Sequence, residues 1–392
     1  MYFEFGLYSS LLLPAFIHGM LFSGLLFFRG IKNERLSDRL LGSLLLLNTI
    51  KLAYWMLGFA GWYDTHNGYT SFMFYFPFNN VFWMGPLLYF YFLSLTNAQF
   101  RFHKKDLRHF ILPAAWWLMI LLKALADYLF YYPFPVTENT QFGAKGPWAE
   151  LDKNYWLTMA GYVSFFYYLF LTQKSFRAYR KYIRENFSAT EDIRFNWLLN
   201  LVYAAAAGMV IFFLFELLST IRREGNSYQL EWYAYFGLCI SIYYLGIAGY
   251  FNATRQVSRL QFTPGKKEEQ QPAKEAPAEW EEWKKKLAEC MRQDEPYLEP
   301  ELNLAALAKK LKTNTSILSK VINEGMGQNF NDYINEYRVR AVMKKMNQGE
   351  HIRQTLLGIA YDCGFNSKAT FNRSFKKITG FTPKDYTNRI KL

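Results

Sequence analysis

The sequence predicts an all-α protein in which a bundle of seven transmembrane helices is followed by a soluble domain of two helix–turn–helix units. Three observations support this prediction. Long apolar stretches recur over the first 255 of the 392 residues, a polar charged segment follows, and the basic end of the chain contains one helical pattern twice. We therefore divide the chain into a seven-span region at 1–255, a flexible charged linker at 256–279 and a helix–turn–helix domain at 280–392.

Seven windows in the first region are long and apolar enough to cross a bilayer, which takes about 20 mostly apolar residues. Five of them contain no Asp, Glu, Lys or Arg, and one of these five, the third window, contains Pro77 and Pro86. The alternative, buried helices of a large soluble protein, would not normally supply so many charge-free runs. The windows are residues 7–28, 40–62, 65–100, 110–131, 154–173, 195–215 and 232–254.

The basic residues between these windows orient the predicted helices. Connections one, three and five and the segment after the last span contain 18 Lys and Arg residues, and the opposite side contains only 4. Basic loop residues stay in the cytoplasm. We therefore expect a multi-pass protein of a bacterial inner membrane, with its N-terminus outside and its C-terminal domain in the cytoplasm.

Six polar residues fall in or near the outer halves of the spans, where burial in lipid is costly unless the group is paired or hydrated. Their clustering predicts a ligand pocket open to the outside. In the alternative, Lys123 and Asp127 pair with each other on one helix face, while Glu216 and Asp127 reach the interface. The six residues are Lys51, Asn79, Asn80, Lys123, Asp127 and Glu216.

The segment 261–279 is rich in Pro, Glu and Lys and has few apolar residues to bury. Such a composition predicts a mobile tether, with a reach of roughly 25 Å. The residues that follow place Trp280, Trp283, Leu287 and Met291 at helical spacing, which predicts an amphipathic helix. We consider this helix a candidate for dimerisation.

The first helix–turn–helix unit begins at Asn303, a residue suited to cap a helix. Leu304, Leu307 and Ala308 form the apolar face of that helix, and a polar turn at 313–314 separates it from the next. The second helix leaves five polar side chains pointing outward. They are Thr315, Ser316, Ser319, Lys320 and Asn323.

The second unit repeats this pattern, with residues 356–360 resembling 304–308. Gly364 allows the turn, and the following helix is expected to bury Phe371, Phe375 and Ile378. Six polar or basic side chains then point outward. They are Ser367, Lys368, Asn372, Arg373, Lys376 and Lys377.

Charge and spacing favour DNA as the partner of this domain. From residue 303 to the end there are 16 Lys and Arg against 6 Asp and Glu. Arg, Lys and Asn on a helix of this width read base edges in the major groove. The residues 331–346 predict one helix of about 25 Å, suited to hold two such helices near successive major grooves, about 34 Å apart. A helical module that binds protein is the alternative.

At these residues the sequence resembles the AraC/XylS family of bacterial transcription regulators, and in particular its membrane-anchored members. The resemblance covers about the last quarter of the chain. It implies two helix–turn–helix units joined by a linker helix, binding to double-stranded promoter DNA, and contact with RNA polymerase. The matching motifs are Pro296-Tyr297-Leu298, Leu318-Ser319-Lys320-Val321-Ile322-Asn323, Ile359-Ala360, Gly364-Phe365-Asn366-Ser367, Phe371, Phe375-Lys376-Lys377, Thr379-Gly380-Phe381-Thr382-Pro383 and Tyr386.

Many family members have a soluble ligand-binding domain where this chain has membrane spans, so no ligand transfers from the family. Cys239, Cys290 and Cys363 lack metal-type spacing, and we predict no catalytic residue, metal or cofactor. We expect a one-component regulator in the lipid bilayer that senses an extracytoplasmic or membrane cue, through an unknown ligand or a partner membrane protein, and that forms a homodimer. The alternative is a transporter or channel-like membrane protein with a regulatory DNA-binding module.

Overall fold

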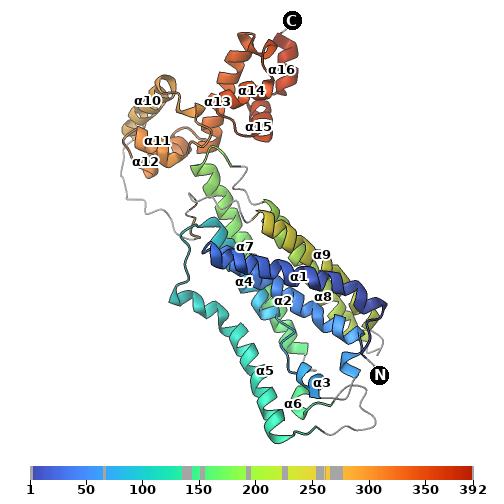
Figure 1. Cartoon of the computed structure of the whole chain (residues 1–392). Coiled ribbons are helices and arrows are strands. Elements are labelled where there is room, and N and C mark those ends of the chain that lie inside the picture. Colours follow the sequence, from blue (N-terminus) through green and yellow to red (C-terminus); the bar gives the residue numbers. More distant parts are fainter. Residues whose placement is uncertain are drawn as a thin grey trace. The chain divides into compact units, whose positions relative to one another are not determined.

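The computed structural model describes residues 3–64, 68–134, 144–150, 155–190, 196–222, 228–252, 260, 262–264 and 277–390. All regular elements among these residues are helices, which confirms the all-α prediction. The chain forms two units (Figure 1). The N-terminal unit comprises Met1–Ser175 and Asn196–Gln261, and the C-terminal unit comprises Phe176–Phe195 and Phe262–Leu392.

In the N-terminal unit, α1 and α2 lie side by side, α9 contacts both of them, α4 contacts α2, and α8 contacts α9. The helix α7 begins in this unit, and its residues from Phe176 onward belong to the C-terminal unit. The helices are α1 (Leu7–Lys32), α2 (Leu36–Phe59), α3 (Gly68–Met73), α4 (Val81–Thr96), α5 (Ile111–Phe130), α6 (Pro147–Glu150), α7 (Tyr155–Asn186), α8 (Asn196–Arg222) and α9 (Tyr228–Asn252).

Close packing and one buried ion pair join α1, α2 and α9. Ser23 on α1 donates a 3.0 Å hydrogen bond to the carbonyl of Gly42 on α2. Small residues on a helix face let backbones approach this closely. Nearer to the connection between α1 and α2, the Arg29 guanidinium donates to both carboxylate oxygens of Asp38 (2.7 and 2.9 Å) and to the carbonyl of Tyr250 (2.6 Å). Arg29 therefore fixes three helices at one point.

Among the described residues, four helical segments are long and apolar enough to cross a membrane: Leu7–Lys32, Leu36–Phe59, Lys104–Phe130 and Glu231–Phe251. The predicted count of seven is not confirmed. The third window is divided between α3 (Gly68–Met73) and α4, which starts after Pro77 and has 16 residues. In α8 the apolar part that the structure describes is confined to Ala206–Phe215.

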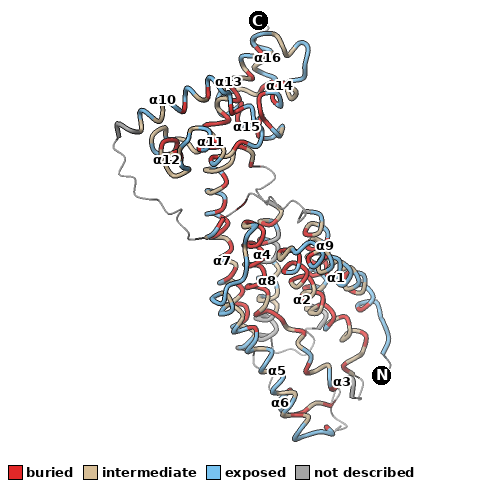
Figure 2. The backbone as a smooth tube through the Cα atoms, turned by 60° about the vertical axis from the view of Figure 1, so that its left-hand side comes forward, coloured by how far each residue is buried: buried red, intermediate tan, exposed pale blue. Residues whose placement is uncertain are grey.

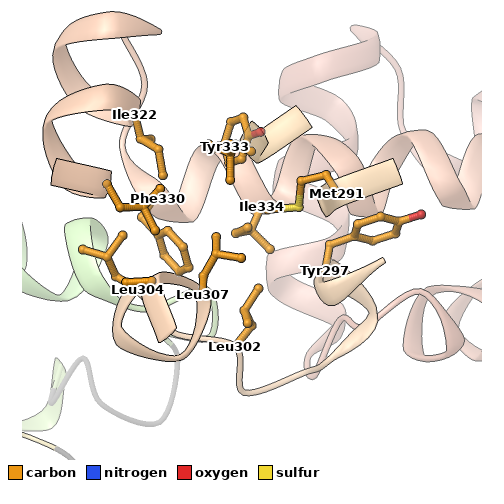
Figure 3. Packing of buried hydrophobic residues seen from close by; sticks show 12 residues of the cluster. Met291, Tyr297, Leu302, Leu304, Leu307, Ile322, Phe330, Tyr333 and Ile334 are labelled. Carbon is orange, nitrogen blue, oxygen red and sulfur yellow. The ribbon is translucent and has the colours of Figure 1, made fainter. Parts of the chain in front are cut away.

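The C-terminal unit is built around α13, which contributes to two hydrophobic cores. Phe330, Tyr333 and Ile334 pack with α10–α12 (Figure 3), whereas Val339 and Val342 pack with α14 and α15. Figure 2 shows the buried residues along α13. The helices are α10 (Pro277–Gln293), α11 (Leu304–Lys310), α12 (Thr315–Lys320), α13 (Phe330–Asn347), α14 (Leu356–Asp362), α15 (Lys368–Thr379) and α16 (Pro383–Ile390).

The apolar stripe of α10 serves this same core. Leu287 and Met291 are fully buried and pack against α11 and α13 residues. They are therefore not free to face a second copy of the chain, so the part of α10 that remains for a dimer contact is smaller than the sequence predicts. Trp280 and Trp283 are half-buried.

The boundary between the units differs from the predicted one. Residues 176–195 belong to the C-terminal unit, although they precede its other part by many residues. Tyr179 and Tyr182 pack against Phe262, with ring centroids 5.4 and 5.6 Å apart. Leu260 and Phe262, at the start of the predicted linker, are buried, and the linker residues 265–276 lie outside the described residues.

Candidate DNA-binding interface

Each helix of the two helix–turn–helix units begins with a side-chain cap. Asn303 accepts a hydrogen bond from the amide of Ala306 (2.9 Å), and Asn314 accepts one from Ile317 (2.8 Å). Thr355 and Ser367 do the same for α14 and α15 at 3.1 Å. Such a cap stabilises a helix by about 0.5–2 kcal/mol. Ser367, predicted as a DNA-facing residue, thus also fixes the start of α15.

The turns of the two units use equivalent positions with left-handed backbone. Gly364 in the second unit has φ +86°, and an added Cβ would lie 2.3 Å from the carbonyl oxygen of Tyr297. Lys312 adopts φ 55° at the matching place in the first unit. Left-handed backbone disfavours residues other than glycine, and the sequence gives no indication that Lys312 adopts it.

The helix α15 presents the basic face that the sequence predicts. Lys368, Asn372, Arg373, Lys376 and Lys377 are exposed. On the opposite face Phe371 and Phe375 are buried in the core. The prediction that Ile378 is buried is wrong, because its side chain is 40% exposed. The core ends at Phe375, which packs on Tyr386 of α16 at 5.4 Å.

The corresponding face of α12 is less accessible. Thr315, Ser316, Ser319, Lys320 and Asn323 are all half-buried. The α-helix ends at Lys320 and continues as one π-helical turn, Val321–Gly325. Within that turn the Asn323 amide donates a 3.0 Å hydrogen bond to the Ser319 hydroxyl. Both side chains are therefore held together at the end of α12.

Arg338 has a structural role that its charge does not indicate. The sequence counts it among the basic residues of the domain, yet its side chain is 1% exposed. Its guanidinium donates to the carbonyls of Tyr297 and Glu299 at 2.7 Å and to the Ser188 hydroxyl at 3.1 Å. Burial lowers the pKa of Arg338 to about 10, so the group remains a cation at neutral pH. Arg338 lies one helical turn after the buried Ile334, but its burial depends on partners outside α13.

An ion pair joins α13, the linker helix between the two helix–turn–helix units, to α15, the second helix of the second unit. The Lys377 ammonium lies 2.8 Å from the Asp332 carboxylate. Both side chains are more than a third exposed, so solvent screens the pair and its contribution to stability is about 1 kcal/mol or less. Its effect is to orient Lys377 toward the start of α13.

The residues of the predicted ligand pocket have their own contacts in the N-terminal unit. Asp127 is fully buried, so it does not reach an interface as the alternative supposed. Its carboxylate accepts hydrogen bonds from the Tyr75 hydroxyl (2.7 Å) and from the amides of Trp148 and Ala149 in α6 (3.1 and 2.9 Å). These bonds attach α6 to α5.

Asn80 is also buried. It donates to the Pro77 carbonyl at 2.8 Å and accepts from the Trp117 indole at 3.0 Å, while the carbonyl of Asn79 accepts from Trp116. The Lys51 ammonium lies 4.1 Å from the ring centroid of Phe212, a cation–π contact. The side chain of Glu216 lies outside the described residues. A ligand pocket formed by these residues and Lys123 stays a prediction.

Comparisons with known proteins identify the C-terminal region. Residues 307–389 match a family model described as a helix-turn-helix domain. The chain is similar to an uncharacterised HTH-type transcriptional regulator, YtdP, of Bacillus subtilis, with 31% identity over 88 residues that cover 22% of this chain and 11% of that protein. It is also similar to one of Staphylococcus aureus (strain COL), with 32% identity over 92 residues that cover 24% of this chain and 12% of that protein.

The chain thus matches only a small part of the length of these relatives, and no solved structure matches it. The matched residues contain α12 to α15 and most of α11 and α16. They include the predicted outward-facing side chains of both recognition helices. The C-terminal region of this chain is therefore an AraC-type helix–turn–helix domain, the DNA-binding module of a family of transcription regulators.

Proposed function

We propose that this protein is a membrane-bound one-component transcription regulator that binds promoter DNA sequence-specifically. The observation that carries the proposal is the exposed basic face of α15, presented by a domain of the AraC type in the same chain as four long apolar helices. Transcription regulation follows from the domain family. The membrane location and the response to a cue rest on the N-terminal unit.

The helices α12 and α15 both contact DNA, and α13 holds them at a fixed separation. The 18 residues of α13 make a helix about 27 Å long at about 1.5 Å per residue. This length is compatible with helices α12 and α15 entering successive major grooves, about 34 Å apart. Asn372 and Arg373 are suited to read base edges, and Lys376 is suited to neutralise a phosphate.

The surface of the N-terminal unit supports a lipid environment. On α5, Leu118, Leu121 and Leu122 are 54–56% exposed, and Figure 2 shows few buried residues along this helix. Large aliphatic side chains exposed along a whole helix are expected to contact lipid rather than water. The excess of basic residues in the predicted connections one, three and five supports a cytoplasmic C-terminal domain. A ligand or a partner membrane protein delivers the cue to this unit.

Binding of the full-length chain, reconstituted in lipid nanodiscs, to promoter fragments tests the proposal. Replacing Arg373 by Ala removes a base contact, so affinity for the preferred site falls by about 1–3 kcal/mol while affinity for unrelated DNA changes little. Lys376→Ala is the matched variant on the same helix face, and it weakens binding to all sequences equally. Equal affinity of the wild type for every duplex would contradict sequence-specific regulation.

A further inference from the structure

The end of α7 and the residues after it are built into the DNA-binding domain. Phe187 forms an antiparallel bridge with Asn303, the cap of α11. The Ser188 amide donates to the carbonyl of Leu302 at 3.1 Å, and the Ser188 hydroxyl donates to the same oxygen at 2.6 Å. Ser188 is fully buried. This segment is therefore packed as a part of the domain rather than as a loop beside it.

The linker helix α13 holds the same segment from the other side. The Asn331 amide donates to the carbonyls of Phe187 (3.2 Å) and Ser188 (2.6 Å), and Arg338 donates to the Ser188 hydroxyl. Asn331 is itself buried. These bonds place the last turn of α7 next to the first turn of α13.

A hollow of about 300 Å³ lies at this junction. Arg184 from the last turn of α7 lines one part of it, and Arg373 and Lys377 from α15 line another. The remaining lining residues are Asn329, Asn331, Asp332 and Ser374. An arginine outside the helix–turn–helix domain thus shares a site with two residues of the DNA-facing surface of α15.

The side chains that line the hollow carry a net positive charge, which favours the binding of an anion. Asp332 is the acidic residue among the described residues that line it, and its carboxylate already pairs with Lys377 at 2.8 Å. Arg184 and Arg373 are left without a carboxylate among the lining residues. The start of α13, an 18-residue helix, adds the positive end of its dipole. The Arg184 guanidinium can bind two oxygens of one phosphate, so a phosphate group suits this site.

We propose that the hollow binds a backbone phosphate of the DNA that α15 contacts, and that Arg184 is a DNA-binding residue supplied by α7. The inference rests on the proposed function. The alternative is that this segment inhibits DNA binding by occupying the DNA-binding face. A segment that replaces DNA should be acidic, but the last turns of α7 are basic. They contain Arg177, Arg180, Lys181 and Arg184 and one acidic residue, Glu185. DNA affinity then depends on where the end of α7 is held.

Titrations of the full-length chain in nanodiscs with a promoter duplex and an unrelated duplex, at several salt concentrations, test this assignment. Arg184→Gln is expected to weaken binding to both duplexes by the same factor and to reduce the slope of log K against log salt by about 1. Arg177→Gln removes the same charge two turns earlier on α7, outside the hollow, and leaves the slope unchanged. Arg184→Lys retains the charge and restores most of the slope.

Three results would overturn the assignment: an unchanged slope for Arg184→Gln, an equal effect of Arg177→Gln, or tighter binding by Arg184→Gln. The last would show that α7 covers the DNA-binding face. Failure of the proposed function is distinguishable, since the wild type would then show no preference for the promoter duplex. Arg184 is exposed, so its replacement leaves the domain folded.

Discussion

Arg338 shows how one residue of the linker helix organises the DNA-binding domain. Its guanidinium satisfies two carbonyls of the chain that leads into α11 and one hydroxyl from the segment after α7. A buried acceptor left without a donor costs about 1–3 kcal/mol. Arg338 therefore contributes to stability by joining segments that lie far apart in sequence.

Replacement of Arg338 by Met is expected to destabilise the domain by about 3 kcal/mol or more, because it leaves several buried acceptors unpaired. Hydrogen exchange of the α13 amides in the full-length chain measures this change. Arg340→Met is the control, because Arg340 is exposed on the same helix and its loss costs little. Equal protection in the two variants would contradict a structural role of Arg338.

Residues whose role depends on local periodicity were predictable from the sequence. The exposed face of α15, from Lys368 to Lys377, follows from helical spacing, and the cap Asn303 follows from its residue type and position. The burial of Arg338 depends on contacts with Ser188 and Tyr297. The spacing of residues within one segment does not indicate such distant partners. The charge of Arg338 alone therefore wrongly suggests an exposed side chain.

At the scale of elements, the two helix–turn–helix units have separate hydrophobic cores, and α13 contributes residues to both. The core of the second unit contains Phe371 and Phe375 of α15 and Cys363 after α14. The core of the first contains Leu304, Leu307 and Ile322. A defect in one core should therefore loosen the helices of that unit more than those of the other.

Phe371→Ala tests this division. Truncating a buried phenylalanine costs about 3–5 kcal/mol, so amide exchange in α14–α16 should rise much more than in α11 and α12. Ile378→Ala is the comparison on the same helix, because Ile378 is 40% exposed and should have little effect. A similar increase of exchange in both units would show that they unfold as one core.

Sequence patterns predicted the helices of the second unit and the linker helix closely, because strong apolar periodicity continues through them. The predicted count of membrane spans is not confirmed. Apolar windows indicate seven, and four helices among the described residues have the length and hydropathy of a span. The helix α4 starts at Val81, after Pro77, Asn79 and Asn80, and a window of average composition does not detect that start.

The division of the whole molecule was predictable only in part. A change from apolar to charged composition separates the two halves of the chain, and the structure also forms two units. The assignment of residues 176–195 to the C-terminal unit was not predictable, because it results from pairing between Phe187 and Asn303. The helix α7 contributes residues to both units.

We propose that this protein regulates transcription while it is embedded in a membrane. Cross-linking in living cells tests this proposal most directly. The membranes are washed with alkali, and the DNA that stays with them is sequenced. We expect the full-length chain to remain in the washed membranes with DNA from discrete promoter sites. A Lys320→Ala/Arg373→Ala variant should stay in the membranes and lose those sites. Recovery of the chain in the aqueous fraction, or of the same DNA with the variant, would show that the protein does not regulate transcription from the membrane.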